Sequence, residues 1–450
     1  MLVGAALSWS VRTLDRALDG ETVYRELLAA EPVAFWLDGS LTDRAARRIS
    51  VLGTGSEVLV RSVADGDVFA ELSALLAGRS GEPPAVLDGY FSGGYVGYFG
   101  YELKALTGGT AAHVAATPDA LWIWADRFVV IDHDRDLTFL VAVNVGDEWL
   151  DRAERAAADW SMTGVTRPAI ADLDLEAHLE LDRPSYLAAV ERCMTALEAG
   201  ETYEVCLTNR VRLPPVPDPF GFFCWQRATN PAPYAAFLRY GDLAVASSSP
   251  ERFLTVDADG WAECRPIKGT APRDLDPFED QLAAKALAED EKTRAENLMI
   301  VDLIRNDLGR VSEPGSVQVP QLMQVETYRT VHQLVTTVRG RLRSDVSVLD
   351  AVRACFPPGS MTGAPKIRTM ELLDELELSA RGVYSGALGY LTVDGRADLS
   401  VVIRTAVLTP DETVIGAGGA IVLDSTPAAE YDEMVLKATA TVGADSLGAS

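Results

Sequence analysis

Apolar residues recur at helical spacing between residues 183 and 199. One apolar residue in every three or four predicts the buried face of an amphipathic helix, marked by Tyr186, Val190, Cys193 and Leu197. Asp182 is placed to cap this helix and Gly200 to end it. The segment before it, 161–182, contains Gly164 and Pro168 and is the predicted linker. We therefore expect an N-terminal subdomain, 1–165, and a second region, 182–446.

Short apolar runs bounded by turn residues predict β-strands on both sides of this linker. The predicted strands are 122–124, 128–132, 137–143, 202–213, 234–247, 384–393, 398–408 and 413–421. Long helices interrupt these runs of strands. The pattern therefore favours an α+β fold with antiparallel sheets over a parallel βαβ fold.

A nearly continuous apolar run with charges embedded in it, 292–311, predicts a helix that is buried on most of its surface. Glu296 lies within this helix. A buried carboxylate needs a cation or a metal ion as a partner, and the local candidate is Lys292, one turn earlier. This helix is therefore a candidate to carry part of a site.

A second helix is predicted from Pro427, and one stripe of it carries Glu430, Glu433 and Lys437. A solvated charged face is one interpretation of this stripe. The other interpretation is a metal site, because two carboxylates one turn apart can hold Mg²⁺ with Glu296 as a third ligand.

Two isolated cations stand in unusual surroundings. Lys268 lies between Pro266 and Gly269, which together predict a tight turn that presents the amine. Arg404 interrupts an apolar strand, which indicates a carboxylate partner. The glycine-rich stretch 416–420 can direct backbone N–H groups at an anion.

Composition excludes several classes of partner. The 450 residues are 48% hydrophobic and 24% charged, as in ordinary globular proteins, but the net charge of −26 repels phosphate backbones and anionic membranes. Five scattered cysteines without CxxC spacing favour a reducing compartment over a disulfide framework or a zinc site. With no predicted signal peptide or membrane span, we expect a cytoplasmic protein that binds neither nucleic acid nor membranes.

Eight segments, in family order over residues 182–440, resemble the chorismate-utilising enzymes. They are SSSPERF (247–253), PIKGT (266–270), KTRAENLMIVDLIRNDLGRV (292–311), GSMTGAPK (359–366), RGVYSGALGY (381–390), VVIRT (401–405), GAGGAIV (416–422) and EYDEMVLKA (430–438). FWLDGS (35–40) and SGGYVGYFGYEL (92–103) add a weaker similarity to the synthase component I subfamilies. The resemblance implies a sandwich of two antiparallel β-sheets, with helices outside and the active site between the layers.

The resemblance also implies roles for individual residues. It makes Glu251 the general acid that protonates the leaving C4 hydroxyl, and it makes Glu296, Glu430 and Glu433 the carboxylates of a Mg²⁺ site. The implied substrate-binding residues are Thr270, His332, Thr362, Tyr384, Arg404, Gly418 and Lys437. Ser40 would mark a tryptophan pocket in the N-terminal part.

Lys268 decides the subfamily. PIKGT resembles the aminodeoxychorismate synthases, whereas the anthranilate synthases are similar to PIAGT at this position. Amination at C4 needs two displacements, because an enzyme amine adds at C2 and ammonia then adds at C4 and expels it. The resemblance thus implies that chorismate and ammonia give 4-amino-4-deoxychorismate through a covalent intermediate on Lys268, with Mg²⁺. No cysteine stands in a GxCxGxQ elbow, so a separate glutamine amidotransferase subunit is expected to supply the ammonia.

Two alternatives to this function stay open. One is an anthranilate synthase component I, and the other is a non-catalytic regulator that binds chorismate or tryptophan. Glu204 stands where isochorismate and salicylate synthases have a lysine that activates water, so those activities are not expected. YEVCL (203–207) resembles the plant and actinobacterial type rather than the YQVNL of many bacterial chains, and the resemblance assigns no role to Glu204.

Overall fold

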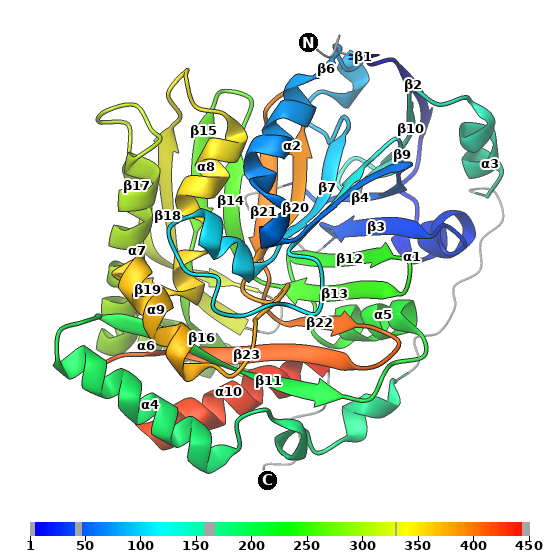
Figure 1. Ribbon diagram of the computed structural model, residues 1–450. Coiled ribbons are helices and arrows are strands. Elements are labelled where there is room, and N and C mark those ends of the chain that lie inside the picture. The colour runs from blue at the N-terminus through cyan, green and yellow to red at the C-terminus, as the bar shows by residue number, and fades with distance from the viewer. Residues whose placement is uncertain (1–4, 41–46, 157–166, 329–330, 443–450) are drawn as a thin grey trace.

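Two large antiparallel β-sheets form the centre of the computed structural model, which describes residues 5–40, 47–156, 167–328 and 331–442 (Figure 1). The first sheet has 11 strands, in spatial order β19 (Gly363–Ala364), β11 (Glu204–Leu213), β23 (Thr413–Ile421), β22 (Thr405–Leu408), β13 (Leu243–Ser249), β12 (Tyr234–Tyr240), β3 (Val33–Asp38), β4 (Ile49–Thr54), β9 (Arg127–Asp132), β10 (Leu137–Val143) and β2 (Trp9–Leu14). The second has 10, in order β16 (Ile267–Pro272), β18 (Val331–Arg341), β15 (Trp261–Arg265), β14 (Arg252–Val256), β21 (Ala397–Val401), β20 (Ala387–Thr392), β7 (Gly94–Phe99), β8 (Ala120–Trp124) and β5 (Glu57–Arg61), with β17 (Gln318–Thr327) also paired to β18. A small parallel pair joins β1 (Ala5–Ala6) to β6 (Arg79–Ser80).

The sheets pack face to face through apolar side chains. Phe91 bridges them, because its ring lies 5.0 Å from Phe128 of one sheet and 5.2 Å from Tyr390 of the other. Burial of such rings is the main stabilising contribution to a sandwich of this kind. The expected α+β sandwich is therefore confirmed.

Helices cover the outer faces. They are α1 (Gly20–Val23), α2 (Val68–Ala77), α3 (Glu148–Ala156), α4 (Arg183–Glu198), α5 (Pro219–Thr229), α6 (Pro277–Glu289), α7 (Glu291–Gly309), α8 (Val348–Cys355), α9 (Lys366–Leu376) and α10 (Pro427–Val442). Short 3₁₀ or π turns are η1 (Tyr24–Leu28), η2 (Val63–Asp65), η3 (Ala85–Leu87), η4 (Tyr101–Leu106), η5 (Ala169–Asp172), η6 (Leu175–His178) and η7 (Gly359–Met361). Figure 1 shows α4 and α10 along β11 and β23, while α7 packs on β16, β18 and α8. No helix in the described ranges is long and apolar enough to span a membrane.

The predicted amphipathic helix is confirmed as α4. The Asp182 carboxylate accepts a hydrogen bond from the Ser185 backbone N–H, which satisfies one free donor of the first turn. The other long helix, α7, differs from expectation. Its buried face is one-sided, and Leu298 is 54% exposed, so the helix is not covered all round.

Two predicted strands each turned out to be two. Residues 234–247 form the hairpin β12–β13, turned at Gly241, whose φ is +56°. Residues 398–408 divide into β21 and β22, which belong to different sheets, and Arg404 at the break has a φ of +51°. A non-glycine residue rarely adopts this conformation, so the apolar pattern gave no sign of the break.

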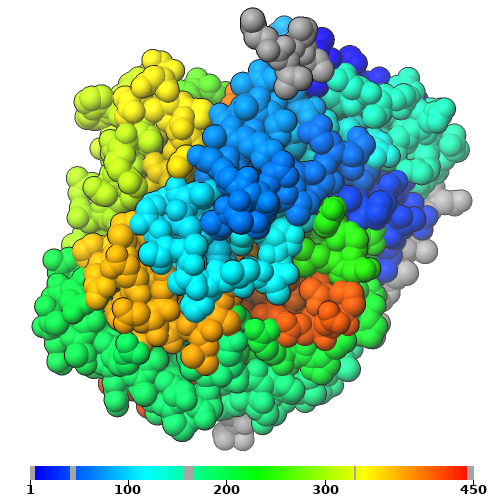
Figure 2. Space-filling model, viewed as in Figure 1, coloured from blue at the N-terminus to red at the C-terminus, as the bar shows by residue number. Residues whose placement is uncertain are grey.

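The sequence segments before and after the predicted linker share both sheets. β3 pairs with β12 in one sheet, and β7 pairs with β20 in the other. Figure 2 shows the blue and cyan surface of the N-terminal segment against yellow, orange and green surfaces of the later one. The division at 165–182 therefore describes the sequence, whereas the sheets run across it.

Candidate active site

The chain crosses from one sheet to the other at two neighbouring places, and each crossing carries a predicted site residue. Glu251 lies between β13 and β14, and Arg404 lies between β21 and β22. The crossings are tied together, because the Val401 N–H donates to the Glu251 carbonyl at 3.0 Å and the Ser249 hydroxyl donates to the Val401 carbonyl at 2.6 Å. Both side chains are thus fixed near the interior of the sandwich by regular strands on either side.

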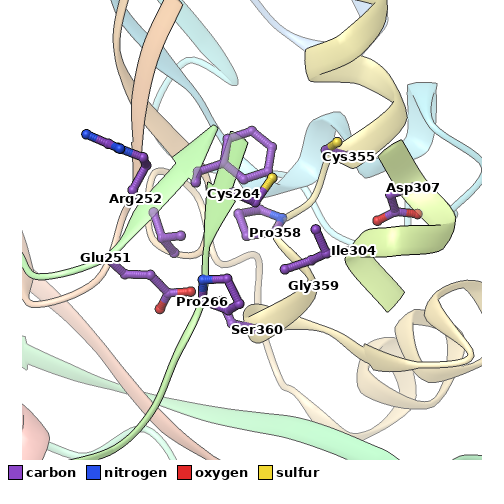
Figure 3. A pocket seen from close by; sticks show the side chains of 12 residues that line it. Glu251, Arg252, Cys264, Pro266, Ile304, Asp307, Cys355, Pro358, Gly359 and Ser360 are labelled. Atoms are coloured by element: carbon purple, nitrogen blue, oxygen red, sulfur yellow. The ribbon is translucent and has the colours of Figure 1, made fainter. Parts of the chain in front are cut away.

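Glu251 is buried beside the 359–361 turn. Burial raises the pKa of its carboxyl to about 7, although the Ser360 hydroxyl and the Lys268 ammonium act in the opposite direction. Figure 3 shows the carboxylate beside Pro266 and Ser360, at a cavity of about 20 Å³. A carboxyl group that keeps its proton near neutral pH can act as a general acid.

Lys268 lies on a strand rather than on the predicted tight turn. β16 carries one extra residue between Ile267 and Thr270 relative to β18, which is a β-bulge, and Gly269 in this bulge has a φ of +83°. A Cβ at Gly269 would come within 2.4 Å of Thr293 on α7, so glycine is required for space as well as for conformation. The bulge directs the lysine toward the opposite sheet.

The amine of Lys268 contacts a carboxylate of that opposite sheet. Its Nζ donates a hydrogen bond to Glu204 Oε1 at 2.5 Å, and both side chains are buried. Burial lowers the pKa of Lys268, but the attraction of Glu204 and Glu296 outweighs burial and raises it. Lys268 is therefore an ammonium group at neutral pH in this state.

The three predicted metal ligands come from two helices that face each other. Glu296 is on α7, where burial raises the pKa of its carboxyl to about 7. Glu430 and Glu433 are on α10, and Lys292 of α7 reaches across to donate to Glu430 at 3.3 Å while lying 3.8 Å from Glu296. Glu433 pairs with Lys437 at 2.5 Å. The carboxylates are thus near one another, each beside a lysine.

Carboxylate oxygens are the type of ligand that a divalent cation needs. Within the described residues, however, no group of three possible ligands is already close enough to hold one. The fit rests on Gly419, where an added Cβ would lie 3.0 Å from Glu430 Oε2 and 4.0 Å from Glu433 Oε1. The missing side chain leaves room beside the carboxylates. Mg²⁺ prefers oxygen ligands and keeps several waters, which agrees with this space. The Mg²⁺ site stays a prediction.

Tyr384 and Arg404, two of the predicted substrate-binding residues, lie near each other and near Glu433. The ring of Tyr384 covers Gly416, since a Cβ there would come within 2.2 Å of the ring. No acceptor in the described ranges binds the guanidinium of Arg404, and burial lowers its pKa although Tyr384 and Glu433 act in the opposite direction. The expected carboxylate partner of Arg404 is absent from those ranges, so its charge is available to an anionic ligand.

The other predicted binding residues have protein partners or lie apart. Lys437 donates to the Gly418 carbonyl at 2.9 Å as well as to Glu433, and Gly418 pairs with Thr208 in the β11–β23 ladder. The Thr362 hydroxyl donates within its own turn.

Thr270 is exposed on β16, and the His332 ring is bonded to Asp280 at 2.9 Å and to Thr327 at 2.9 Å. The structure therefore does not bring Thr270 and His332 into the charge cluster around Lys268.

Ser40 lies elsewhere, on the N-terminal side of the first sheet. It donates to the Asp38 carboxylate and accepts from Arg227. Asp38 and Gly39 help to line a cavity of about 170 Å³ between the sheets, together with Tyr234, Tyr390 and Asp398. A tryptophan in this cavity stays a prediction.

Sequence reasoning missed the Lys268–Glu204 contact and two further contacts of the site. Ser360, which bonds to Glu251, stands inside the GSMTGAPK segment, so its position was the available signal. Lys292 was considered only as a local partner of Glu296, because nothing in the sequence places it near Glu430, which lies 138 residues later.

The site between the two antiparallel sheets thus combines a buried carboxyl group, a buried amine and a guanidinium without an acceptor among the described residues, a set of groups suited to a small anionic ligand. Comparison with known proteins identifies the family. Residues 38–443 match the chorismate binding enzyme family, and the chain belongs to it.

Known relatives of the chain include both aminodeoxychorismate synthases and anthranilate synthases. The chain is 45% identical to the aminodeoxychorismate synthase of Streptomyces pristinaespiralis, over 96% of this chain and 64% of that protein. It is 38% identical to aminodeoxychorismate synthase component 1 of Salmonella typhimurium, over 91% and 87%. The solved anthranilate synthase component I of Streptococcus pneumoniae superposes with a TM-score of 0.75 at 29% identity, covering 89% of this chain and 93% of that one. The chain thus spans less than two thirds of the length of the first of these relatives.

Proposed function

We propose that this chain catalyses the amination of chorismate, converting chorismate and ammonia to 4-amino-4-deoxychorismate with Mg²⁺. The observation that carries the proposal is the buried Lys268 amine, held by Glu204 and close enough to Glu251 to affect its pKa. The similarity to aminodeoxychorismate synthases supports it. The anthranilate-type alternative leaves this amine without a task, and a non-catalytic regulator leaves both the amine and the acid without one.

The proposed reaction has two displacements. The Lys268 amine forms a bond to C2, the ring double bonds shift, and the C4–O bond breaks while Glu251 donates the proton that lets the oxygen leave as water. Ammonia then bonds to C4, the double bonds shift back, and the C2–N bond to Lys268 breaks. Glu251, now a carboxylate, takes a proton from the new C4 ammonium group and returns to its starting state.

The remaining residues bind the substrate. We assign Arg404 and Tyr384 to a substrate carboxylate, because the half-buried Arg404 guanidinium has no protein acceptor among the described residues. Glu296, Glu430 and Glu433 would hold the Mg²⁺ ion, which supplies counter-charge to a substrate carboxylate when bound. A glutamine amidotransferase subunit is proposed as the source of ammonia. The five buried free thiols support a reducing, cytoplasmic location for the protein.

Product identification tests the proposal. Purified protein incubated with chorismate, Mg²⁺ and ammonium should give 4-amino-4-deoxychorismate by mass spectrometry. Anthranilate with pyruvate would support the anthranilate synthase instead, and chorismate binding without turnover would support the regulator.

A further inference from the structure

The ion pair between Glu204 and Lys268 joins the two sheets at their ends. Glu204 opens β11 and Lys268 lies in the bulge of β16, and the two residues are 1% and 8% exposed. Only one carboxylate oxygen of Glu204 is used in this pair. The other, Oε2, is buried without a hydrogen-bond partner in the described part of the chain. A buried carboxylate with an open acceptor is costly, which indicates a role beyond stability.

The proposed reaction gives this pair a specific problem. An ammonium group has no lone pair, so Lys268 cannot attack C2 until it loses a proton. The loss must go to a base that touches Nζ, because the burial of Lys268 keeps bulk water away. Glu204 is the one residue to which Nζ donates among those that the structure describes.

We propose that Glu204 is the catalytic base of Lys268, taking a proton from Nζ before the attack on C2 and returning it after the lysine is expelled. This inference rests on the proposed function and adds a residue to it. The protons balance: Glu204 starts and ends as a carboxylate and Lys268 as an ammonium group. Glu251 separately supplies the proton that leaves with the C4 oxygen and recovers one from the C4 ammonium.

The geometry suits a short proton transfer. At 2.5 Å the Lys268 amine and the Glu204 carboxylate are in direct contact, so the proton needs no intermediate carrier. Glu204 is also fixed in position, since β11 pairs there with Ala364 of β19 and the Thr202 hydroxyl donates to the Glu204 carbonyl at 3.0 Å. The two acids occupy separate places, Glu251 beside Ser360 and Glu204 on Lys268, so each can serve a different proton.

Other ionisable groups act on the pair and must be held constant in a test. Those that influence the pKa of Lys268 or share its surroundings include Cys206, Glu251, Glu296, Glu433 and Lys437. A change at Glu204 leaves these side chains in place but removes a charge that raises the pKa of Glu251 and of Glu296. The ratio of the variant rate to the wild-type rate is therefore compared well below pH 7, where Glu251 stays protonated in both proteins.

Glu204→Gln is the variant to make, because the amide keeps the size and an acceptor oxygen but cannot take a proton. We expect its rate of 4-amino-4-deoxychorismate formation at pH 7 to fall about a hundredfold. The deficit should shrink as pH rises, since a larger share of Lys268 is then already the neutral amine before chorismate binds and needs no base. Dividing the variant rate by the wild-type rate at each pH cancels the rise in free ammonia. Glu201→Gln is the matched control. Glu201 lies three residues before Glu204 and is an exposed carboxylate paired with Arg368, so this variant should have the wild-type rate.

Three results would overturn the role of Glu204 while leaving the proposed function intact. They are an equal or faster Glu204→Gln rate at pH 7, a deficit that does not change with pH, and a Glu204→Asp variant with the same pH-dependent deficit as the amide. The aspartate should instead show a pH-independent deficit, because it keeps a base at a longer reach. Chorismate binding and the unfolding midpoint, measured for each variant, exclude a folding defect. A wild-type enzyme that makes no 4-amino-4-deoxychorismate would overturn the proposed function first.

Discussion

Lys292 of α7 and Glu430 of α10 meet across the site, where Nζ donates to Oε1 at 3.3 Å. The Ser425 hydroxyl donates to the same oxygen at 2.6 Å, so Glu430 is held from two sides. The lysine also lies 3.8 Å from Glu296. A positive charge thus stands between the carboxylates of the two helices, which would otherwise repel each other.

The first prediction concerns Mg²⁺. Glu433→Gln should fold normally, because this side chain is half exposed, but should lose turnover by at least about a hundredfold if it helps to bind the metal. EDTA should abolish wild-type activity, and added Mg²⁺ should restore it. Asp432→Asn, an exposed carboxylate on the same helix paired with Arg183, is the control. Full activity in EDTA would remove the metal from the mechanism.

Gly419 offers an independent test of the same space. A methyl group at this position would lie 3.0 Å from Glu430 Oε2, so Gly419→Ala should displace the carboxylates by a few tenths of an ångström. We expect turnover to fall about tenfold and the Mg²⁺ requirement to rise, since small displacements are costly at a reacting centre. Titration of activity with Mg²⁺ measures both. An unchanged Mg²⁺ titration would place the metal elsewhere.

Lys268→Ala tests the covalent step. The variant should bind chorismate but make no detectable 4-amino-4-deoxychorismate, because nothing would then occupy C2 for ammonia to expel. Slow attack on C2 by ammonia or water would give a 2-substituted product instead. The wild-type peptide that contains Lys268 should carry a chorismate-derived adduct after rapid quenching, detected by mass spectrometry. Near wild-type formation of the 4-amino product by the variant would exclude the covalent role and reopen the anthranilate-type reading.

The pKa of Glu251 predicts a pH limit on the first displacement. A general acid works only while protonated, and burial places this pKa at about 7. At constant free ammonia, and with Mg²⁺ saturating so that Glu296 stays ionised, kcat/KM for chorismate should be level below that pH and fall about tenfold per unit above it. Ser360→Ala should move the fall to higher pH, since the Ser360 hydroxyl stabilises the carboxylate. A fall that moves to lower pH would contradict the assignment of Glu251.

The source of nitrogen can be tested with the chain alone. Ammonium at alkaline pH should support amination by these 450 residues, whereas glutamine should not, because all five cysteines are buried and none is in a glutaminase elbow. Burial also raises the pKa of Cys193 and Cys224 to about 12, so neither is a ready thiolate. Release of glutamate by the chain alone would contradict the expected second subunit.

Local sequence signals predicted much of the fold. The cap at Asp182 and the apolar spacing behind it located α4 to within a residue, because both depend on neighbours along the chain. The stripe on the last helix likewise brought Glu430, Glu433 and Lys437 to one face. The resemblance to the family then implied that two antiparallel sheets pack as a sandwich, which periodicity alone leaves open.

What local patterns missed depends on distant partners. The apolar run around Arg404 gave no sign that the chain leaves one sheet for the other there, because the run continues on both sides of the break. Lys268 was expected on a turn, although pairing with β18 extends the segment into a strand with a bulge. Its contact with Glu204 joins residues 64 positions apart, so no spacing rule could have predicted it.

The pairing of β3 with β12 and of β7 with β20 bears on how this protein can be engineered. A cut between the N-terminal and later segments would leave two polypeptides, each with unpaired strand edges and neither with a finished sandwich. Such halves should be insoluble when produced separately and should assemble when produced together. The proposed activity would then depend on whether the two halves meet, which is the basis of a split-enzyme reporter.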